Sequence, residues 1–159
     1  MKIKNILLTL LTAISLSGCL TTKHKPNMTP LEIQSLQSRE YEATKEVVFP
    51  SVISVFQDIG YTISNANLQT GLISAESSSD SDFSSRFWLG VTKVSQTKAT
   101  AFIEKIGSKT KVRLSFVEVK RVSSKWGQTD RQDTPILDAK LYQNAFDKIE
   151  NAIFIRSQN

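Results

Sequence analysis

The sequence of 159 residues contains one cysteine, Cys19, and one histidine, His24. A single cysteine excludes an internal disulfide, and the lone histidine lies near the N-terminus, away from the bulk of the chain. A serine–histidine nucleophile and a histidine or cysteine metal site are therefore not available to the main domain. The chain also has no phosphate-binding glycine loop, so we expect no cofactor and no metal.

Long apolar runs are missing too, apart from a short one at the N-terminus. Lys2 and Lys4 precede a stretch from Ile6 to Leu16 that only threonine and serine interrupt. This stretch is shorter than the roughly 20 apolar residues that a membrane-spanning helix needs. A basic start followed by a short apolar core is typical of a secretory signal peptide.

The leader ends in Leu16-Ser17-Gly18-Cys19, which resembles the lipobox of bacterial lipoproteins. In that family the cysteine receives a diacylglyceryl group, the leader is cut before it, and the new amine is acylated, for instance with palmitate. The resemblance implies a signal peptide over residues 1–18 and a lipid anchor on Cys19. Leu20 follows in place of the aspartate associated with inner-membrane retention, which implies the periplasmic face of the outer membrane. The alternative is an ordinary secreted protein with a stray cysteine.

Blocks of lysine or arginine are absent from the sequence. The leader holds two of the 20 basic residues and no acid, so 18 basic residues stand against 15 acidic ones after cleavage, a net charge of +3. This charge and the exported address argue against a nucleic-acid partner. We interpret residues 19–29 as a lipidated tether and residues 30–159 as one periplasmic domain with a core of its own.

Capping residues and apolar spacing predict the elements of the first half of this domain. Thr29-Pro30-Leu31-Glu32 carries a capping box and predicts a helix over residues 30–37. A strand is expected over residues 39–44. Helical spacing follows over residues 48–59, with Pro50 in or near the first turn and Gly60 at the left-handed stop. Next we expect a hairpin that places Ile63 opposite Ile73.

The second half predicts a longer hairpin and a final helix. Alternating apolar residues over 98–121 and the turn Gly107-Ser108 place Ala101 opposite Leu114 and Glu104 opposite Lys111. A four-residue loop is the alternative and would place Glu104 opposite Arg113. Residues 77–85 and 123–133 are polar and predict loops. Thr134-Pro135 is expected to begin a helix whose apolar stripe continues through Phe154 and Ile155 to the C-terminus. The order of these elements predicts an α+β fold, with an antiparallel sheet of about five strands and two main helices packed on one face.

Several motifs resemble a group of small bacterial envelope lipoproteins of unassigned activity. They are Ile33-x-x-Leu36-Gln37-x-Arg39-x-Tyr41, Val55-Phe56-Gln57-Asp58-Ile59-Gly60-Tyr61-x-Ile63, Gly71-Leu72-Ile73-x-Ala75 and Tyr142-Gln143-x-x-Phe146 with Ile153-Phe154. The resemblance spans most of residues 30–159. A more distant similarity is to the small α+β domains of accessory lipoproteins of the β-barrel assembly machinery. Neither resemblance implies catalytic residues.

We therefore expect a non-enzymatic envelope lipoprotein that binds another envelope protein. Phe83, Arg86, Phe87 and Trp88 are the candidate contact residues, because aromatic side chains and arginine are enriched at interface hot spots. These rings could instead cover the domain's own core or meet the membrane surface. Two other functions stay open: a binder of a small apolar or lipid ligand between sheet and helices, and an envelope hydrolase that uses two of the carboxylates Asp58, Glu76, Glu104 and Glu118.

Overall fold

The computed structural model describes residues 28–77, 80–81, 92–123 and 129–158. The predicted signal peptide, Cys19 and most of the tether lie outside the described residues. So do the four candidate contact residues Phe83, Arg86, Phe87 and Trp88.

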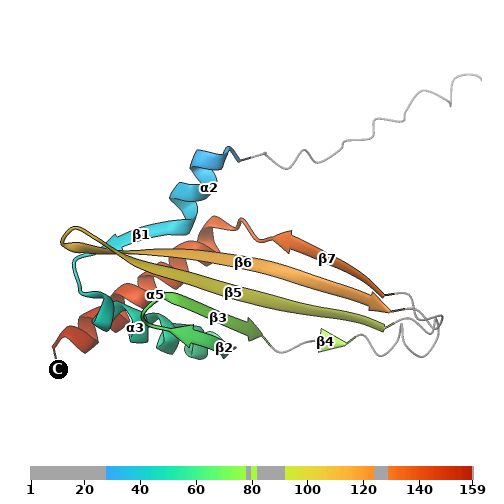
Figure 1. The fold of residues 1–159 in the computed structure, drawn as a ribbon. Coiled ribbons are helices and arrows are strands. Elements are labelled where there is room, and N and C mark those ends of the chain that lie inside the picture. The colour runs from blue at the N-terminus through green and yellow to red at the C-terminus, as the bar shows by residue number, and fades with distance from the viewer. Residues whose placement is uncertain (1–27, 78–79, 82–91, 124–128, 159) are drawn as a thin grey trace, which may run out of the picture.

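The described chain has the predicted α+β fold. Seven antiparallel strands form one sheet with the order β1-β6-β5-β3-β2, and β4 and β7 pair with β5 and β6 beside this path. Among the described residues the helices α3 and α5 pack side by side on one face, and α2 stands at the β1 edge (Figure 1). The strands are β1 (Ser38–Tyr41), β2 (Tyr61–Asn67), β3 (Leu72–Ser77), β4 (Asp80–Ser81), β5 (Thr92–Ile106), β6 (Lys109–Ser123) and β7 (Thr129–Pro135). The helices are α2 (Pro30–Gln37), α3 (Lys45–Asp58) and α5 (Ala139–Ser157).

The β5–β6 hairpin is the centre of the sheet. Its register pairs Ala101 with Leu114 and Glu104 with Lys111, as predicted. Gly107 has φ +63°, which suits a two-residue turn with glycine first. Both strands are 15 residues long and extend beyond the predicted range of 98–121 in the direction away from this turn.

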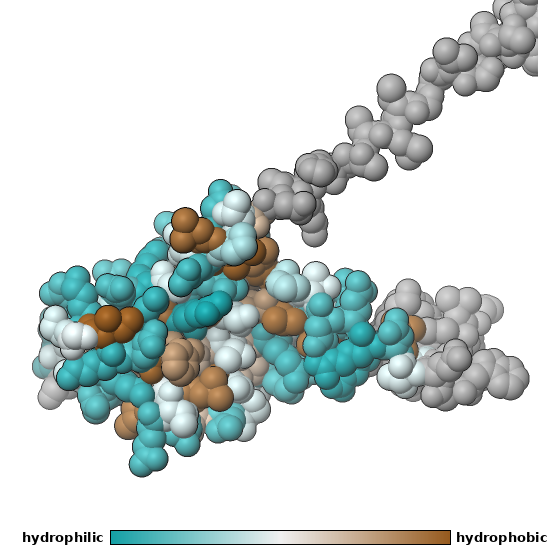
Figure 2. Space-filling model, turned by 45° about the horizontal axis from the view of Figure 1, so that its top comes forward, coloured by the Kyte–Doolittle hydropathy of each residue, from teal (hydrophilic) through white to brown (hydrophobic). Residues whose placement is uncertain are grey.

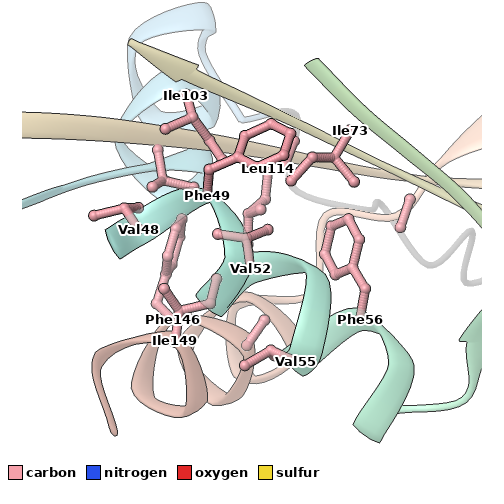
Figure 3. Close-up of a cluster of buried hydrophobic side chains, with 14 of the residues drawn as sticks. Val48, Phe49, Val52, Val55, Phe56, Ile73, Ile103, Leu114, Phe146 and Ile149 are labelled. Atoms are coloured by element: carbon pink, nitrogen blue, oxygen red, sulfur yellow. The ribbon is translucent and has the colours of Figure 1, made fainter. Parts of the chain in front are cut away.

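The core lies between the sheet and the two long helices, as the apolar patterns predict. Val48, Val52 and Phe56 of α3 and Ile149 of α5 are all completely buried. They meet alternate side chains of the central strands, among them Ile103 and Leu114 (Figure 3). The predicted stripe of α5 is confirmed through Ile153. Its continuation is wrong, because Phe154 and Ile155 are each 64% exposed.

The start of α2 is also as predicted. Thr29 Oγ1 accepts a hydrogen bond from the Glu32 amide at 3.3 Å, and a Glu32 carboxylate oxygen accepts one from the Thr29 amide at 2.7 Å. The hydrogen bond from the Thr29 backbone lowers the pKa of Glu32. The helix ends at Gln37, the last residue of the predicted range.

The first predicted strand is present but ends earlier than predicted, and Pro50 lies further into its helix than the first turn. β1 ends at Tyr41, and Thr44 already caps α3, with its carbonyl accepting the amide of Val48 at 3.0 Å. Pro50 is therefore the sixth residue of α3 and lies in the second turn. Proline removes one backbone hydrogen bond there, and the buried apolar stripe on both sides of it keeps the helix in place.

The predicted register of the β2–β3 hairpin is wrong by two residues at Ile63 and by three residues beyond the bulge that follows it. Ile63 pairs with Ala75, and Ile73 pairs with Ala66. β2 continues to Asn67 with a bulge between Ile63 and Asn65, and the turn closes at Gly71, which has φ +77°. A shift by two residues keeps the side chains on the same face, and the bulge accommodates the third residue, so the apolar pattern did not distinguish the two registers.

Both predicted loops contain strand residues. β3 runs to Ser77 and β4 pairs Asp80 and Ser81 with β5, while β7 pairs residues 129–135 with β6. The predicted helix start at Thr134-Pro135 is wrong for the same reason. Asp138 caps α5 instead, and its carboxylate accepts the amides of Lys140 and Leu141 at 2.8 and 3.3 Å.

Truncation of either central phenylalanine should test the packing of these two helices. Phe56→Ala and Phe146→Ala should each lower the free energy of unfolding by about 3–5 kcal/mol, because each ring is fully or almost fully buried. Phe154→Ala is the matched control on α5 and should change it by less than about 0.5 kcal/mol. Urea unfolding measures all three, and a loss below about 1 kcal/mol for Phe56→Ala or Phe146→Ala would contradict the packing.

Candidate functional site

The sheet continues past the ends of α3 and α5 and forms a projecting arm, which we define as residues 80–81, 92–97, 117–123 and 129–135 (Figure 1). β7 is exposed along its whole length. The part of the arm whose surface can be described is mostly hydrophilic (Figure 2). Val119 of β6 is buried, and the other side chains of the arm whose burial is described are half-buried or exposed. These strands are therefore stabilised by pairing with their neighbours more than by a core beneath them.

Charged side chains stabilise the open face of the arm. Arg131 donates from Nε and Nη2 to the two carboxylate oxygens of Asp133, at 2.8 and 2.6 Å. This hydrogen bonding lowers the pKa of Asp133. Arg121 lies directly opposite Arg131 in the register, and the acids Asp133 and Glu76 are close enough to interact with this pair of cations.

An apolar cleft opens where the helices end and the arm begins. Its lining comes from the end of α3, the start of β2, the middle of β6 and the first half of α5, and its volume is about 450 Å³. Five of the lining side chains are apolar or aromatic, and two are polar. The lining residues are Ile59, Tyr61, Phe116, Leu141, Ala145, Asn144 and Lys148.

One wall of this cleft is stabilised by contacts among four aromatic rings. The ring of Phe116 lies 6.2 Å from Tyr61, 6.3 Å from Phe56 and 5.2 Å from Tyr142 between centroids. Edge and tilted contacts of this kind favour aromatic packing. Burial raises the pKa of Tyr61, and a hydrogen bond with Thr97 opposes this shift. The cleft is thus formed before any ligand arrives.

Tyr142 fixes the position of Phe116. Its hydroxyl accepts the Phe116 amide and Gln37 Nε2, each at 3.3 Å. On this side of β6, pairing with β1 ends at Arg113 and pairing with β7 begins at Val117. Phe116 lies between these two points, where the Tyr142 hydroxyl takes the place of a neighbouring strand. The buried backbone donor of Phe116 would otherwise lose its partner there.

A second hollow lies between α2, β1 and β6, with a volume of about 480 Å³. Cations and an acid share its lining, which is Leu31, Gln34, Ser35, Ser38, Arg39, Glu40 and Lys111. Arg39 is already engaged, because it pairs with Asp147 at 3.0 Å and lies 5.0 Å from the centre of the Phe146 ring. This hollow has a weaker preference for one kind of ligand than the apolar cleft.

The open face of the sheet, opposite the helices, has a small apolar patch. Leu72 and Phe102 are paired in the register and are 37% and 42% exposed. Arg113 stands beside Phe102 on β6. Figure 2 shows apolar surface on the broad end of the molecule as separate patches among hydrophilic residues. Isolated patches of this size are common on protein surfaces.

Two of the four candidate carboxylates have salt-bridge partners. Glu76 pairs with Lys98 at 2.7 Å, and Glu118 pairs with Lys120 at 3.1 Å. Hydrogen bonds from these lysines lower the pKa of both acids. A general acid at neutral pH needs a raised pKa, so these shifts are in the wrong direction for that role.

The other two candidate carboxylates, Glu104 and Asp58, lie at separate places in the fold. Glu104 faces Lys111 across the hairpin on the open face of the sheet, and Asp58 is exposed at the end of α3. Strand alternation puts Glu118 on the opposite face from Glu76 and Glu104. No group of three or more histidine, cysteine or acidic residues suited to a metal occurs in the described part of the chain. Nor does any helix there combine the length and apolar character needed to cross a membrane.

The predicted contact segment lies outside the described residues, but the strands at its two ends are described. Ser81 pairs with Val94 in β4–β5, and Thr92 pairs with Ser123 in β5–β6. The residues that line the cleft were not predicted from the sequence. The feature of the sequence that marks the cleft is the spacing of Leu141, Ala145 and Lys148 on one side of α5. This spacing by itself is also typical of the edge of a buried helix face.

Comparison with protein-family models and with curated proteins gave no match to this chain.

Proposed function

We propose that this chain is a bacterial cell-envelope lipoprotein, anchored by lipid on Cys19 to the periplasmic face of the outer membrane. Its domain binds another envelope protein and catalyses no reaction. The observation that supports the binding role is the arm, a polar extension of the sheet beyond the helices (Figure 1). The lipid anchor rests on the motif Leu16-Ser17-Gly18-Cys19. Strands that cover little core contribute little to stability through burial, so their length is better explained by a binding role.

The arm also supports the choice of contact residues. Phe83, Arg86, Phe87 and Trp88 fall between Ser81 and Thr92, and both of these residues belong to strands of the arm. A partner that meets the arm would therefore be close to the ends of this aromatic segment. Tryptophan, arginine and phenylalanine supply large contact area at protein interfaces.

The alternative of an envelope hydrolase has less support. Glu76 and Glu118 are paired with lysines and lie on opposite faces of the sheet, which favours structural roles for both. The alternative of a small apolar or lipid ligand is favoured by one specific observation, the apolar cleft beside Tyr61 and Phe116.

Replacement of the cysteine tests the anchor. Cys19→Ser should abolish fatty-acid labelling and leave the leader uncut, because the sulfur is the atom that receives the lipid. Ser17→Ala keeps a small residue before Cys19 and should stay labelled. Metabolic labelling with an alkyne fatty acid measures both, and undiminished labelling of Cys19→Ser would refute the lipid anchor.

Site-specific photocrosslinking tests the partner. A photoreactive residue at Gln132, which is exposed on β7, should give one dominant protein adduct in intact envelopes. The same residue at Asn151, exposed on α5, is the control and should give none. Changing Phe87 and Trp88 to serine should abolish the Gln132 adduct while leaving the unfolding midpoint unchanged.

Two results would contradict this proposal. Equal adducts from Gln132 and Asn151 would show that the arm has no special role. A fall of several kcal/mol in stability on the double serine change would mean that these rings belong to the domain's own core.

A further inference from the structure

We propose that the cleft beside Tyr61 and Phe116 is a binding site for an amphiphilic anion that carries a single alkyl chain. The chain would lie against the apolar wall, and the anionic group would lie at Lys148. This site goes beyond the proposed protein-binding function and does not depend on it.

The wall of the cleft suits an alkyl chain. Five of the seven lining residues are apolar or aromatic, and the volume of about 450 Å³ falls within the range of small-molecule sites. Phe116 is only 1% exposed and is held on three sides by other rings. A wall fixed in this way loses little side-chain freedom when a ligand binds.

The charge at the rim selects an anion. Among the described residues, Lys148 is the only charged one that lines the cleft, and it forms no salt bridge with any of them. Its neighbour Asp147 is already paired with Arg39 at 3.0 Å. Asp58 precedes Ile59 but does not line the cleft. Asn144, one turn before Lys148 on α5, can donate a further hydrogen bond to a carboxylate or phosphate.

An extended peptide fits the cleft less well. Such a peptide would have to pair with β2, the edge strand that begins at Tyr61. The bulge between Ile63 and Asn65 interrupts that edge, and Ser64 Oγ donates across it to the Ser74 carbonyl at 3.0 Å. Bulges at edges oppose strand addition. A free amphiphile enters the cleft without needing this edge.

Photoaffinity labelling of the full-length protein in isolated envelopes tests the site. The probes are a diazirine palmitate, a diazirine lysophosphatidylglycerol, whose phosphodiester carries a net negative charge, and a diazirine alkylammonium, all of matched chain length. We expect the two anionic-headed probes to label the peptides that contain Tyr61 and residues 141–148, with little labelling by the ammonium. The anionic probe that gives the stronger labelling shows whether the cleft prefers a carboxylate or a phosphodiester headgroup.

Variants on α5 supply matched controls. Lys148→Glu should reduce labelling by the anionic probes tenfold or more, whereas Lys140→Glu, an exposed lysine on the same helix that does not line the cleft, should stay within twofold. Asn144→Trp should block the cleft, and Gln143→Trp should not. Labelling of the cleft should persist in Cys19→Ser, so failure of the lipid anchor and failure of this site are distinguishable.

Three outcomes would overturn the proposal. They are equal labelling by the ammonium and the palmitate probes, equal loss in Lys148→Glu and Lys140→Glu, and a photoreactive residue at Asn144 that captures a protein while the palmitate probe labels nothing in the cleft. The last result would assign the cleft to a protein segment.

Discussion

The pairing of β5 with β6 is the constraint on which the rest of the structure depends. Fifteen residues of extended strand span about 50 Å, whereas the 14 residues of α3 span about 21 Å and the 19 of α5 about 28 Å. Helices of these lengths cannot cover the whole hairpin. The covered end contains the core, and the uncovered end becomes the arm, with polar residues on β7 and ion pairs on the open face.

The cleft follows from the same difference in length. α3 ends at Asp58 and α5 is capped by Asp138, so the helical layer stops beside Phe116 while β6 continues. Tyr142 lies at this end of the core, where its hydroxyl accepts the Phe116 amide and its ring packs against the Phe116 ring. The cleft beside Phe116 is lined mainly by apolar side chains, and Lys148 lies at its rim. Core packing and the candidate ligand site therefore share the same phenylalanine.

Patterns within one element predicted much of this fold, and interactions between elements limited the rest. The α+β class, the β5–β6 register and the buried face of α5 followed from local spacing and one glycine turn. The β2–β3 register did not, since a two-residue shift leaves Ile63 and Ile73 on the same face. Strand β7 has no apolar alternation, because it covers little of the core, so its polar residues looked like a loop. The cleft depends on where two helices end relative to the sheet, which no single motif encodes.

The central claim is that the covered end of the sheet supplies the stability and leaves the arm free for binding. Native-state amide hydrogen exchange tests this claim by comparing the amides of Ala99–Phe102 in β5 with those of Val119–Val122 in the arm part of β6. The comparison is fair because both groups pair with a strand on each side. The account predicts that the arm amides exchange by local opening at a lower free energy, and that Phe56→Ala accelerates exchange at Ala99–Phe102 by roughly 100-fold or more while leaving the arm amides unchanged. Equal protection of both groups, with equal acceleration in Phe56→Ala, would contradict it.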